Sequence, residues 1–492
     1  MKKTGIMALL LAGTLAVLPL TAWGAEEEYP EWDDDPAEVT WYMWNLGGTA
    51  TPEGIEAVEE ALNEITLPKI NVEVDLEILE MGTYLTQMAM EVSAGEKIDL
   101  ISTFPAMAGS YAQMLASNQL MPLDDLLEEE APELLETVPD EVLKATRKNG
   151  VTYAVPIYND QRNDYYWLAR TSVLEEAGID PESIHDYKDI TEVFEKVHEI
   201  RPDLKMVSTA GQNLTGQTGA LLNGTLYDNI GSNVAAVMVE EDAAKVVCLF
   251  ETEEYKETVH ILNEWYEAGY IDMDAPIRQD APTTDRSVFS EFLGGNPTRT
   301  LTTDSAAGEP ITKVKLAEGP ISTGVATIMT MAIPVSATEP EGAARLMNLC
   351  YTDPTVKNLV SYGIEGVDYT LNEDGAIVKA DNALYNPNSV GIFGNQFLAY
   401  PTVEEVNAGI ASEAVNPDDW YYSPLYGFSI DLEPISALDA QIQSVYGEYN
   451  ATIACGFGTD ETYQEYIDKL YASGLQEYLD ELQRQLDEYL AQ

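Results

Sequence analysis

The sequence predicts an α/β fold in which helices cover a largely parallel sheet. Residues 39–103 alternate three strand-like segments with two segments whose apolar residues recur at the helical period. A strand–helix–strand–helix–strand order needs crossover connections, which produce parallel strands with helices on the faces of the sheet. The length of 492 residues allows two or three domains.

The N-terminal elements have clear boundary signals. Thr51 can cap a helix that begins with Pro52, because its hydroxyl accepts a free N–H of the first turn and proline fixes a helical φ. Gly95 supplies the C-terminal cap of the next helix. The predicted elements are strands at 39–44, 70–79 and 98–103, and helices from 52 onward and at 84–93.

The same signals continue along the chain. Gly178 and Gly269 follow helical segments as caps, and Gly474 divides the helical C-terminus. Asn372-Glu373-Asp374-Gly375 separates two short strand-like segments and predicts a β-hairpin. The predicted elements are strands at 151–157, 166–170, 328–333, 369–371 and 376–378, and helices at 172–177, 189–199, 253–268, 339–350 and 461–490.

Residues 1–24 have the organisation of a secretory signal peptide. Lys2 and Lys3 precede an uncharged apolar run, and Ala22-Trp23-Gly24 supplies the small residues of a cleavage site. The apolar run is short for a membrane span. We therefore expect an exported protein, extracellular or associated with the cell surface, whose mature chain begins near Ala25.

The chain is strongly acidic, with 85 Asp and Glu against 25 Lys and Arg, a net charge of −60. Such a surface repels nucleic acid and anionic membranes, so neither is an expected partner. Residues 25–36 are acidic and contain two prolines, which predicts a flexible tether. The three cysteines, Cys248, Cys350 and Cys455, have no metal or redox spacing and are interpreted as small core residues.

Motifs of catalytic or cofactor chemistry are absent from the sequence. It contains no G-x-S-x-G, no H-E-x-x-H, no Walker pattern and no Rossmann glycine pattern. The three histidines are scattered through helix-like segments. We therefore expect no cofactor, no metal and no enzymatic activity. A secreted glycoside hydrolase would need two carboxylates that face each other. With so many Asp and Glu residues, the sequence does not indicate any particular pair for this role.

Aromatic residues with a polar group are abundant: 28 tyrosines and 7 tryptophans against 9 phenylalanines. Such residues can stack on sugar rings and also form hydrogen bonds. Several lie where strands should end, and open α/β sheets bind ligands there. The Gly363–Gly366 loop adds two further candidates, because glycine allows close approach of the backbone. The candidate ligand-binding residues are Trp44, Asn45, Tyr158, Asp160, Tyr166, Trp167, Glu365, Tyr369 and Asn395.

Four segments of the chain carry a resemblance through their order. They are Ala94-Gly95-Glu96-Lys97-Ile98-Asp99-Leu100-Ile101, Leu120-Met121-Pro122-Leu123-Asp124-Asp125-Leu126-Leu127, Asn149-Gly150-Val151-Thr152-Tyr153-Ala154-Val155-Pro156 and Leu174-Glu175-Glu176-Ala177-Gly178-Ile179. Together and in this order they resemble a known family, the extracellular solute-binding proteins of carbohydrate-type ABC importers.

A second set of segments resembles a subgroup of this family with a C-terminal domain of unknown function. Members of the subgroup are often called lipoproteins. The segments are Tyr362-Gly363-Ile364-Glu365-Gly366-Val367-Asp368-Tyr369, Phe393-Gly394-Asn395-Gln396-Phe397, Leu425-Tyr426-Gly427-Phe428-Ser429 and Glu481-Leu482-Gln483-Arg484-Gln485-Leu486-Asp487.

The resemblance implies a periplasmic-binding-protein-like (Venus-flytrap) fold with two α/β lobes, an interlobe cleft and two or three crossing segments. The implied N-terminal lobe comprises 37–155 and 326–360, and the C-terminal lobe 156–325 and 361–492. Lobe closure around the solute is a hinge motion. The sequence departs from the lipoprotein pattern, because Thr14 follows Leu11-Ala12-Gly13 where a cysteine would carry the lipid.

The favoured function is a solute-binding component of an ABC importer that takes a neutral solute, a mono- or oligosaccharide, and delivers it to membrane permease subunits. We expect a monomer. Two alternatives stay open: a binder of another small solute such as a peptide or polyamine, and a surface sensor or adhesion module without transport. Binding of a cation would weaken with salt, whereas stacking on a neutral sugar would not.

Overall fold

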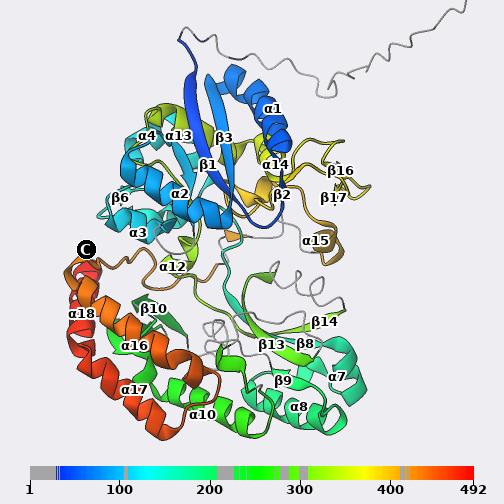
Figure 1. Cartoon of the computed structure of the whole chain (residues 1–492), viewed down its shortest axis with the longest axis vertical. Coiled ribbons are helices and arrows are strands. Elements are labelled where there is room, and N and C mark those ends of the chain that lie inside the picture. Colours follow the sequence, from blue (N-terminus) through cyan, green and yellow to red (C-terminus); the bar gives the residue numbers. More distant parts are fainter. Residues whose placement is uncertain are drawn as a thin grey trace, which may run out of the picture.

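The protein is described from a computed structural model. The structure describes residues 29, 32, 34–104, 109–207, 226–231, 233–239, 241–271, 273–277, 287–297, 309–409, 416–417 and 420–491. These residues form two lobes stacked along the long axis of the molecule (Figure 1). The predicted signal peptide lies outside the described residues.

The upper lobe is built on a five-stranded mixed sheet in the order β3-β1-β4-β15-β7. The strands β1, β3 and β4 are parallel, as the sequence predicts, while β15 is antiparallel to its neighbours. The carboxyl ends of the parallel strands therefore share one edge, which faces the lower lobe (Figure 1). The strands are β1 Ala37–Asn45, β3 Val72–Glu80, β4 Leu100–Ser102, β15 Thr330–Ala332 and β7 Val155–Pro156.

Helices cover both faces of this sheet, and their ends follow the predicted signals. The Thr51 hydroxyl accepts the Gly54 N–H at the start of α1, and Gly95 ends α2 with a φ of 74°. The helices are α1 Pro52–Ile70, α2 Met81–Ala94, α3 Tyr111–Ala116, α4 Asp124–Glu130, α5 Pro132–Thr137, α6 Asp140–Leu143, α13 Pro340–Thr352 and α14 Pro354–Tyr362.

The lower lobe contains a mixed sheet in the order β14-β8-β13-β9 and a separate antiparallel sheet, β10-β11-β12. The first sheet packs on α7, α8 and α10 around a second hydrophobic core centred on Trp167, Phe194 and Trp265. The strands are β8 Asp164–Arg170, β9 Lys205–Val207, β10 Tyr227–Gly231, β11 Ala235–Met238, β12 Asp242–Cys248, β13 Val288–Gly295 and β14 Ile311–Ala317. The helices are α7 Thr171–Ala177, α8 Tyr187–Ile200 and α10 Glu253–Glu267.

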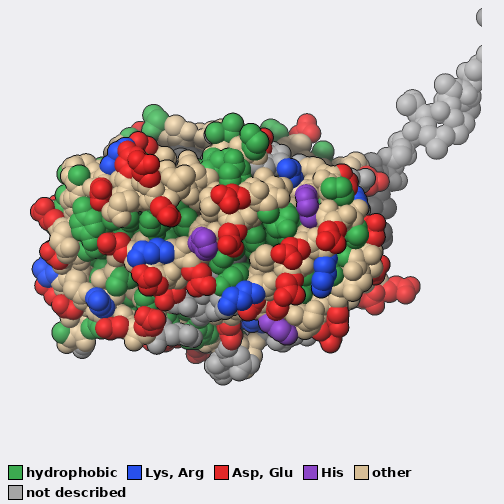
Figure 2. Space-filling view, turned by 90° about the horizontal axis from the view of Figure 1, so that it is seen from below, with side chains coloured by type: hydrophobic (Ala, Val, Ile, Leu, Met, Phe, Trp, Pro, Cys, Tyr) green, Lys and Arg blue, Asp and Glu red, His purple; other side chains and the backbone are tan. Residues whose placement is uncertain are grey.

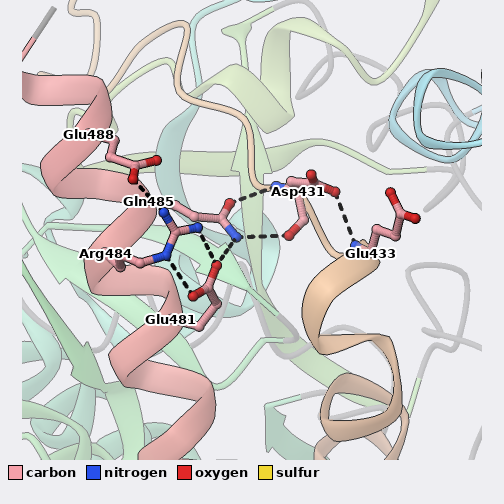
Figure 3. Close-up of polar contacts among 6 residues, drawn as sticks. All are labelled: Asp431, Glu433, Glu481, Arg484, Gln485 and Glu488. Atoms are coloured by element: carbon pink, nitrogen blue, oxygen red, sulfur yellow. Dashed lines mark hydrogen bonds and ion pairs between the residues drawn. The ribbon is translucent and has the colours of Figure 1, made fainter.

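Three C-terminal helices pack on β10–β12 and on α10 to form a third core. They are α16 Ser436–Ala454, α17 Asp460–Ala472 and α18 Leu475–Leu490, and Gly474 separates the last two as predicted. On α18, Gln485 accepts a hydrogen bond from the Asp431 N–H (2.8 Å) and donates one to the Asp431 carbonyl (2.9 Å), while Arg484 pairs with Glu481 and Glu488 (Figure 3). Gln485 thus ties α18 to the chain that precedes α16.

Residues 361–400 pack with the upper lobe, which differs from the expected boundary at 361. Tyr385 and Phe393 belong to the first core, and β18 Tyr385–Asn386 pairs with β2 Thr49–Ala50. The buried Asp368 carboxylate accepts the N–H groups of Leu384 and Tyr385 and so fixes the fold of this segment. The predicted hairpin is present here, as β16 Tyr369–Leu371 and β17 Ile377–Lys379.

Part of the predicted tether is attached to the upper lobe. The Trp32 indole donates a hydrogen bond to the Pro68 carbonyl (3.1 Å), and the Asn71 amide donates to the carbonyls of Asp34 and Asp35. The expectation of a flexible segment through residue 36 is therefore wrong at its C-terminal end. Charge and proline content do not predict contacts with the end of α1, which lies more than 30 residues away in the sequence.

The surface is acidic and the cysteines are buried. Figure 2 shows acidic side chains spread over the face beneath the lower lobe, interrupted by single basic side chains. All three cysteines are free and buried, as predicted. Within the described ranges, no helix is both long and apolar enough to cross a membrane, and no group of three or more metal-binding side chains gathers.

Candidate functional site

Three segments connect the lobes. The first, 155–164, leaves β7 of the upper sheet and enters β8. The second, 317–326, returns from β14, and Ile321 already belongs to the upper core. The third, 420–428, contributes Trp420 to the upper core and continues toward the C-terminal helices.

The second and third crossing segments pair with each other. The Ile321 N–H donates to the Tyr421 carbonyl (2.7 Å), and the Ser423 N–H donates to the Ile321 carbonyl (2.9 Å). The first segment pairs with the upper-lobe residues that follow Phe393, because the Tyr158 N–H donates to the Gly394 carbonyl (3.0 Å). The lobes are therefore joined by short, hydrogen-bonded strands rather than by free loops.

An aromatic cluster lies on the first and third crossing segments and on the upper-lobe chain that pairs with the first. It consists of Tyr158, Phe397, Trp420, Tyr422 and Tyr426. The Tyr158 ring lies 5.0 Å from Phe397 and 6.5 Å from Trp420, centroid to centroid. Trp420 lies 6.2 Å from Tyr422, which contacts Tyr426 at 4.6 Å. The neighbouring rings meet edge-on or tilted, so their faces are not stacked on one another.

Among the described residues, three buried polar atoms of the first and third crossing segments have no hydrogen-bond partner. They are Nε1 of Trp420, Oε1 of Gln161 and Oδ1 of Asp164. Nε1 of Trp44, at the carboxyl end of β1, is a fourth. A buried donor or acceptor without a partner costs about 1–3 kcal/mol, so such atoms call for an explanation. Together they offer indole donors and amide or carboxylate acceptors, the complement of a hydroxyl-rich ligand.

The carboxylates of the first crossing segment are paired with the protein's own cations. Asp160 forms a two-bond ion pair with Arg162, with N–O distances of 2.6 and 2.8 Å. The Lys315 ammonium lies 2.8 Å from Oδ2 of Asp164. The local charge is therefore largely neutralised despite the acidity of the whole chain.

Glu291 adds a buried carboxyl on the lower sheet. It pairs with Leu168 of β8 and so lies on the face opposite Trp167 and the second core. Burial raises the pKa of Glu291 to about 7. Near neutral pH this carboxyl is therefore partly protonated and can donate as well as accept a hydrogen bond.

Among the candidates in the upper lobe, Trp44 and Asn45 end β1 at the edge that faces the lower lobe. The buried Trp44 ring meets Phe104 edge-on at 5.1 Å. The Asn45 amide is used within the protein, because it donates to Glu80 (2.9 Å) and accepts from the Gly48 N–H (2.8 Å). Asn45 thus closes the turn after β1.

Tyr158, Asp160 and Asn395 lie together at the first crossing segment, where an isolated bridge joins Tyr158 to Asn395. Tyr158 belongs to the aromatic cluster. The Asn395 side chain donates to the Tyr351 carbonyl (3.2 Å) and accepts from the Phe397 N–H (2.9 Å). Its polar atoms, like those of Asp160, are therefore engaged by the protein itself.

The two candidates of β8 point to opposite faces of the sheet. Trp167 lies in the second core beside Phe289, so it is a packing residue. Tyr166 lies on the other face, and its hydroxyl donates to Asp164 (3.1 Å). Successive residues of a strand alternate between faces, so the pair could not line one site.

Glu365 and Tyr369 are not brought together with the others. Glu365 is exposed, and Tyr369 packs in a small separate cluster with Tyr362 and Ile377. The residues that the sequence argument missed are Phe397, Trp420, Tyr422, Gln161 and Asp164. The run Trp420-Tyr421-Tyr422 was the available signal, since it places three consecutive aromatic side chains with polar atoms side by side in the sequence.

Comparison with known proteins identifies the family. The model of the family "Bacterial extracellular solute-binding protein" matches residues 50–357, more than half of the chain. The chain belongs to this family. A second model, "Domain of unknown function (DUF3502)", matches residues 424–491, which begin within the third crossing segment and include the three C-terminal helices. The family consists of solute-binding proteins rather than enzymes, in agreement with the expectation from the sequence.

This solute-binding protein is similar over almost its whole length to characterised relatives. It is 23% identical to a carbohydrate ABC transporter substrate-binding protein of Streptococcus pneumoniae, over 91% of this chain and 90% of the relative. The crystal structure of the N-glycan transport solute binding protein NgtS from Streptococcus pneumoniae matches with a TM-score of 0.81 at 20% identity, over 92% of this chain and 99% of that one. The NgtS complex with Man1GlcNAc matches with a TM-score of 0.72 at 20% identity, over 93% and 100%. These similarities confirm the two-lobed solute-binding-protein fold.

Proposed function

We propose that this protein is the solute-binding component of an ABC importer and captures a neutral carbohydrate, a mono- or oligosaccharide, between its lobes. The aromatic cluster on the crossing segments is the observation that carries the proposal. Ring faces suit the C–H surfaces of sugars, and the unpaired atoms of Trp420, Gln161 and Asp164 suit hydroxyl groups. The names of the relatives, a carbohydrate transporter component and an N-glycan binder, support the same class of solute.

The ion pairs favour a neutral solute over a polyamine. A polycation would need carboxylates without a partner, whereas Asp160 is neutralised by Arg162 and Asp164 by Lys315. The partly protonated Glu291 also presents less negative charge than its residue type suggests. Binding of a neutral sugar should therefore change little between low and high salt.

Capture and release require the lobes to move. The TM-score is lower against the NgtS complex with Man1GlcNAc than against the first NgtS structure, and a different arrangement of the lobes would produce such a difference. Delivery to membrane permease subunits follows from the ABC importer assignment.

We also propose that the exported chain is cleaved near Ala25, as the sequence of the first 24 residues indicates. Mass spectrometry of the mature N-terminus tests this, and an uncleaved N-terminus or cleavage before Thr14 would refute it.

The decisive test of the solute is calorimetry with a panel of neutral oligosaccharides, beginning with a mannose–N-acetylglucosamine disaccharide, beside peptides and spermidine. For the sugar that binds, Tyr158→Ala and Trp420→Ala should each weaken affinity roughly 30-fold, which corresponds to about 2 kcal/mol. Trp32→Ala, which removes an aromatic ring from the outer surface of the upper lobe, is the matched control and should leave affinity unchanged. Binding of spermidine or peptides with no response to any sugar would overturn the proposal.

A further inference from the structure

Asp228 lies on β10 beneath the point where the crossing segments converge. It is buried, with 6% of its surface exposed. Its Oδ2 accepts a hydrogen bond from the Ser423 hydroxyl at 2.6 Å. The Ser423 N–H in turn donates to the Ile321 carbonyl at 2.9 Å. Asp228 therefore ties the lower lobe to the third crossing segment directly and to the second through Ser423.

The first crossing segment reaches the same place. Tyr165 follows this segment at the start of β8 and is close enough to Asp228 for the charge of Asp228 to raise the pKa of Tyr165. A Cβ at Gly319 of the second segment would lie 3.0 Å from the Tyr165 ring, so the two segments touch there. All three connections between the lobes thus meet around one carboxylate.

Few other charges act on this carboxylate. In the part of the chain that the structure describes, Asp228 forms no ion pair. Among the described residues, Tyr165 on β8 is a titratable group that the charge of Asp228 reaches, Tyr227 precedes Asp228 on β10, and β11 faces it with Val237. Burial, followed by the charge of Asp228, raises the pKa of Tyr165 to about 12, and burial raises the pKa of Tyr227 well above its usual range. Both tyrosines stay neutral under physiological conditions.

We propose that Asp228 is a positioning residue of the hinge, whose loss of charge loosens the tie between the lower lobe and the paired crossing segments and thereby changes the lobe arrangement. An ionised carboxylate accepts the Ser423 hydroxyl in a charge-assisted bond, which is stronger than the neutral bond that a carboxylic acid can form. Ser423 cannot easily reorient to offset the weaker bond to a protonated Asp228, because its hydroxyl oxygen already accepts the Leu425 N–H at 3.1 Å. Any effect on solute affinity rests on the proposed function, whereas the effect on the hinge does not.

The charge of Asp228 changes under mildly acidic conditions. Burial raises its pKa to about 6, and the hydrogen bond from Ser423 opposes this rise. Above that pH the ionised carboxylate holds the crossing segments, and below it the tie weakens. Because Glu291 beside the candidate site also titrates in this range, the test must report conformation and not affinity.

The experiment is small-angle X-ray scattering and tryptophan fluorescence of the unliganded full chain between pH 5.0 and 7.5. The wild type should show a transition near pH 6 in its radius of gyration and its emission. Asp228→Asn, which mimics the protonated state, should lack the transition and resemble the acidic wild type at pH 7.5. Ser423→Ala removes the hydroxyl that makes the tie, so it should also lack the transition and resemble the acidic wild type at pH 7.5. A purely structural role of Asp228 would lower stability without any pH-dependent change in the radius of gyration of the wild type.

Asp99→Asn is the matched control. Asp99 is a fully buried carboxylate that accepts N–H groups within the upper lobe alone, from Thr40, Thr338 and Glu339. Its variant should lose stability and keep the transition near pH 6. A transition absent from the wild type, or retained in Asp228→Asn or in Ser423→Ala, would overturn the proposal. Absence of sugar binding alongside the expected scattering would refute the proposed function and leave the hinge proposal standing.

Discussion

Gly394 is a position where a single added methyl group should damage the candidate site. It has a φ of 58°, and a Cβ built there would lie 2.2 Å from the Cys350 carbonyl oxygen and 2.8 Å from its carbon. Both atoms belong to the backbone at the end of α13, so rotation of a side chain cannot relieve the clash. The Gly394 carbonyl also accepts the Tyr158 N–H, which joins the upper lobe to the first crossing segment.

The cost of Gly394→Ala has two parts. The left-handed backbone conformation costs about 1–2 kcal/mol for a residue with a Cβ. Displacement of the segment by about an ångström, out of a packed core, adds about 1–3 kcal/mol of overpacking. A total of roughly 3 kcal/mol would lower the midpoint of thermal unfolding by about 6–12 °C for a lobe of this size. Solute affinity should fall as well, because Phe397 and Tyr158 are displaced together.

Gly375→Ala separates these two parts. Gly375 has a similar positive φ of 76° in the β16–β17 turn, but nothing lies within 4 Å of its Cβ position. This variant should lose only the backbone part, roughly 1–2 kcal/mol, and keep its affinity. Differential scanning calorimetry of both variants measures the difference. Equal midpoints for the two variants would refute the argument that the Cys350 carbonyl blocks a side chain at Gly394.

Two further predictions concern a buried lysine and the C-terminal helix. Burial lowers the pKa of Lys357, which donates to the carbonyls of Val390 and Phe393, to about 7. Above pH 7 the unfolded chain then binds up to one proton more than the folded chain, so the free energy of unfolding of the wild type should rise by up to about 2 kcal/mol from pH 7.0 to 8.5. Lys357→Met should remove this rise when unfolding is measured with a chemical denaturant. An equal dependence on pH in both proteins would contradict the prediction. Gln485→Ala should destabilise the C-terminal helices by roughly 1 kcal/mol, because it removes the two part-buried hydrogen bonds to the Asp431 backbone. Arg484→Ala removes only ion pairs of an exposed side chain and should lower stability by less than Gln485→Ala in the same assay.

The sequence predicted those parts of the fold that local chemistry determines. Helix ends at Thr51, Gly95, Gly178 and Gly474 were correct because a side-chain cap or a positive φ is a property of one residue and its neighbours. The place of residues 361–400 was not predictable in this way. It depends on contacts between distant residues, such as the hydrogen bond from the Tyr385 hydroxyl to the Val360 carbonyl.

The candidate site was predicted in part, and the reason lies in what each residue type can do. Tyr158 belongs to the aromatic cluster, whereas the amides of Asn45 and Asn395 cap turns, a role for which asparagine is equally suited. Residue type alone cannot separate these uses. The alternation of strand faces could have excluded Trp167 beside Tyr166, but only once the register of β8 was known.

The arrangement of the crossing segments links solute contact to lobe movement. A solute shifts the balance between two lobe arrangements only by its difference in affinity for them. The rings of Tyr158 and Trp420 lie on the first and third crossing segments, and Phe397 lies on the upper-lobe chain that pairs with the first. A sugar held by these rings would therefore contact elements whose separation changes when the lobes rotate. Contacts to one lobe alone would bind solute equally well in both arrangements. The position of the aromatic cluster on the crossing segments would therefore couple solute binding to closure of the lobes.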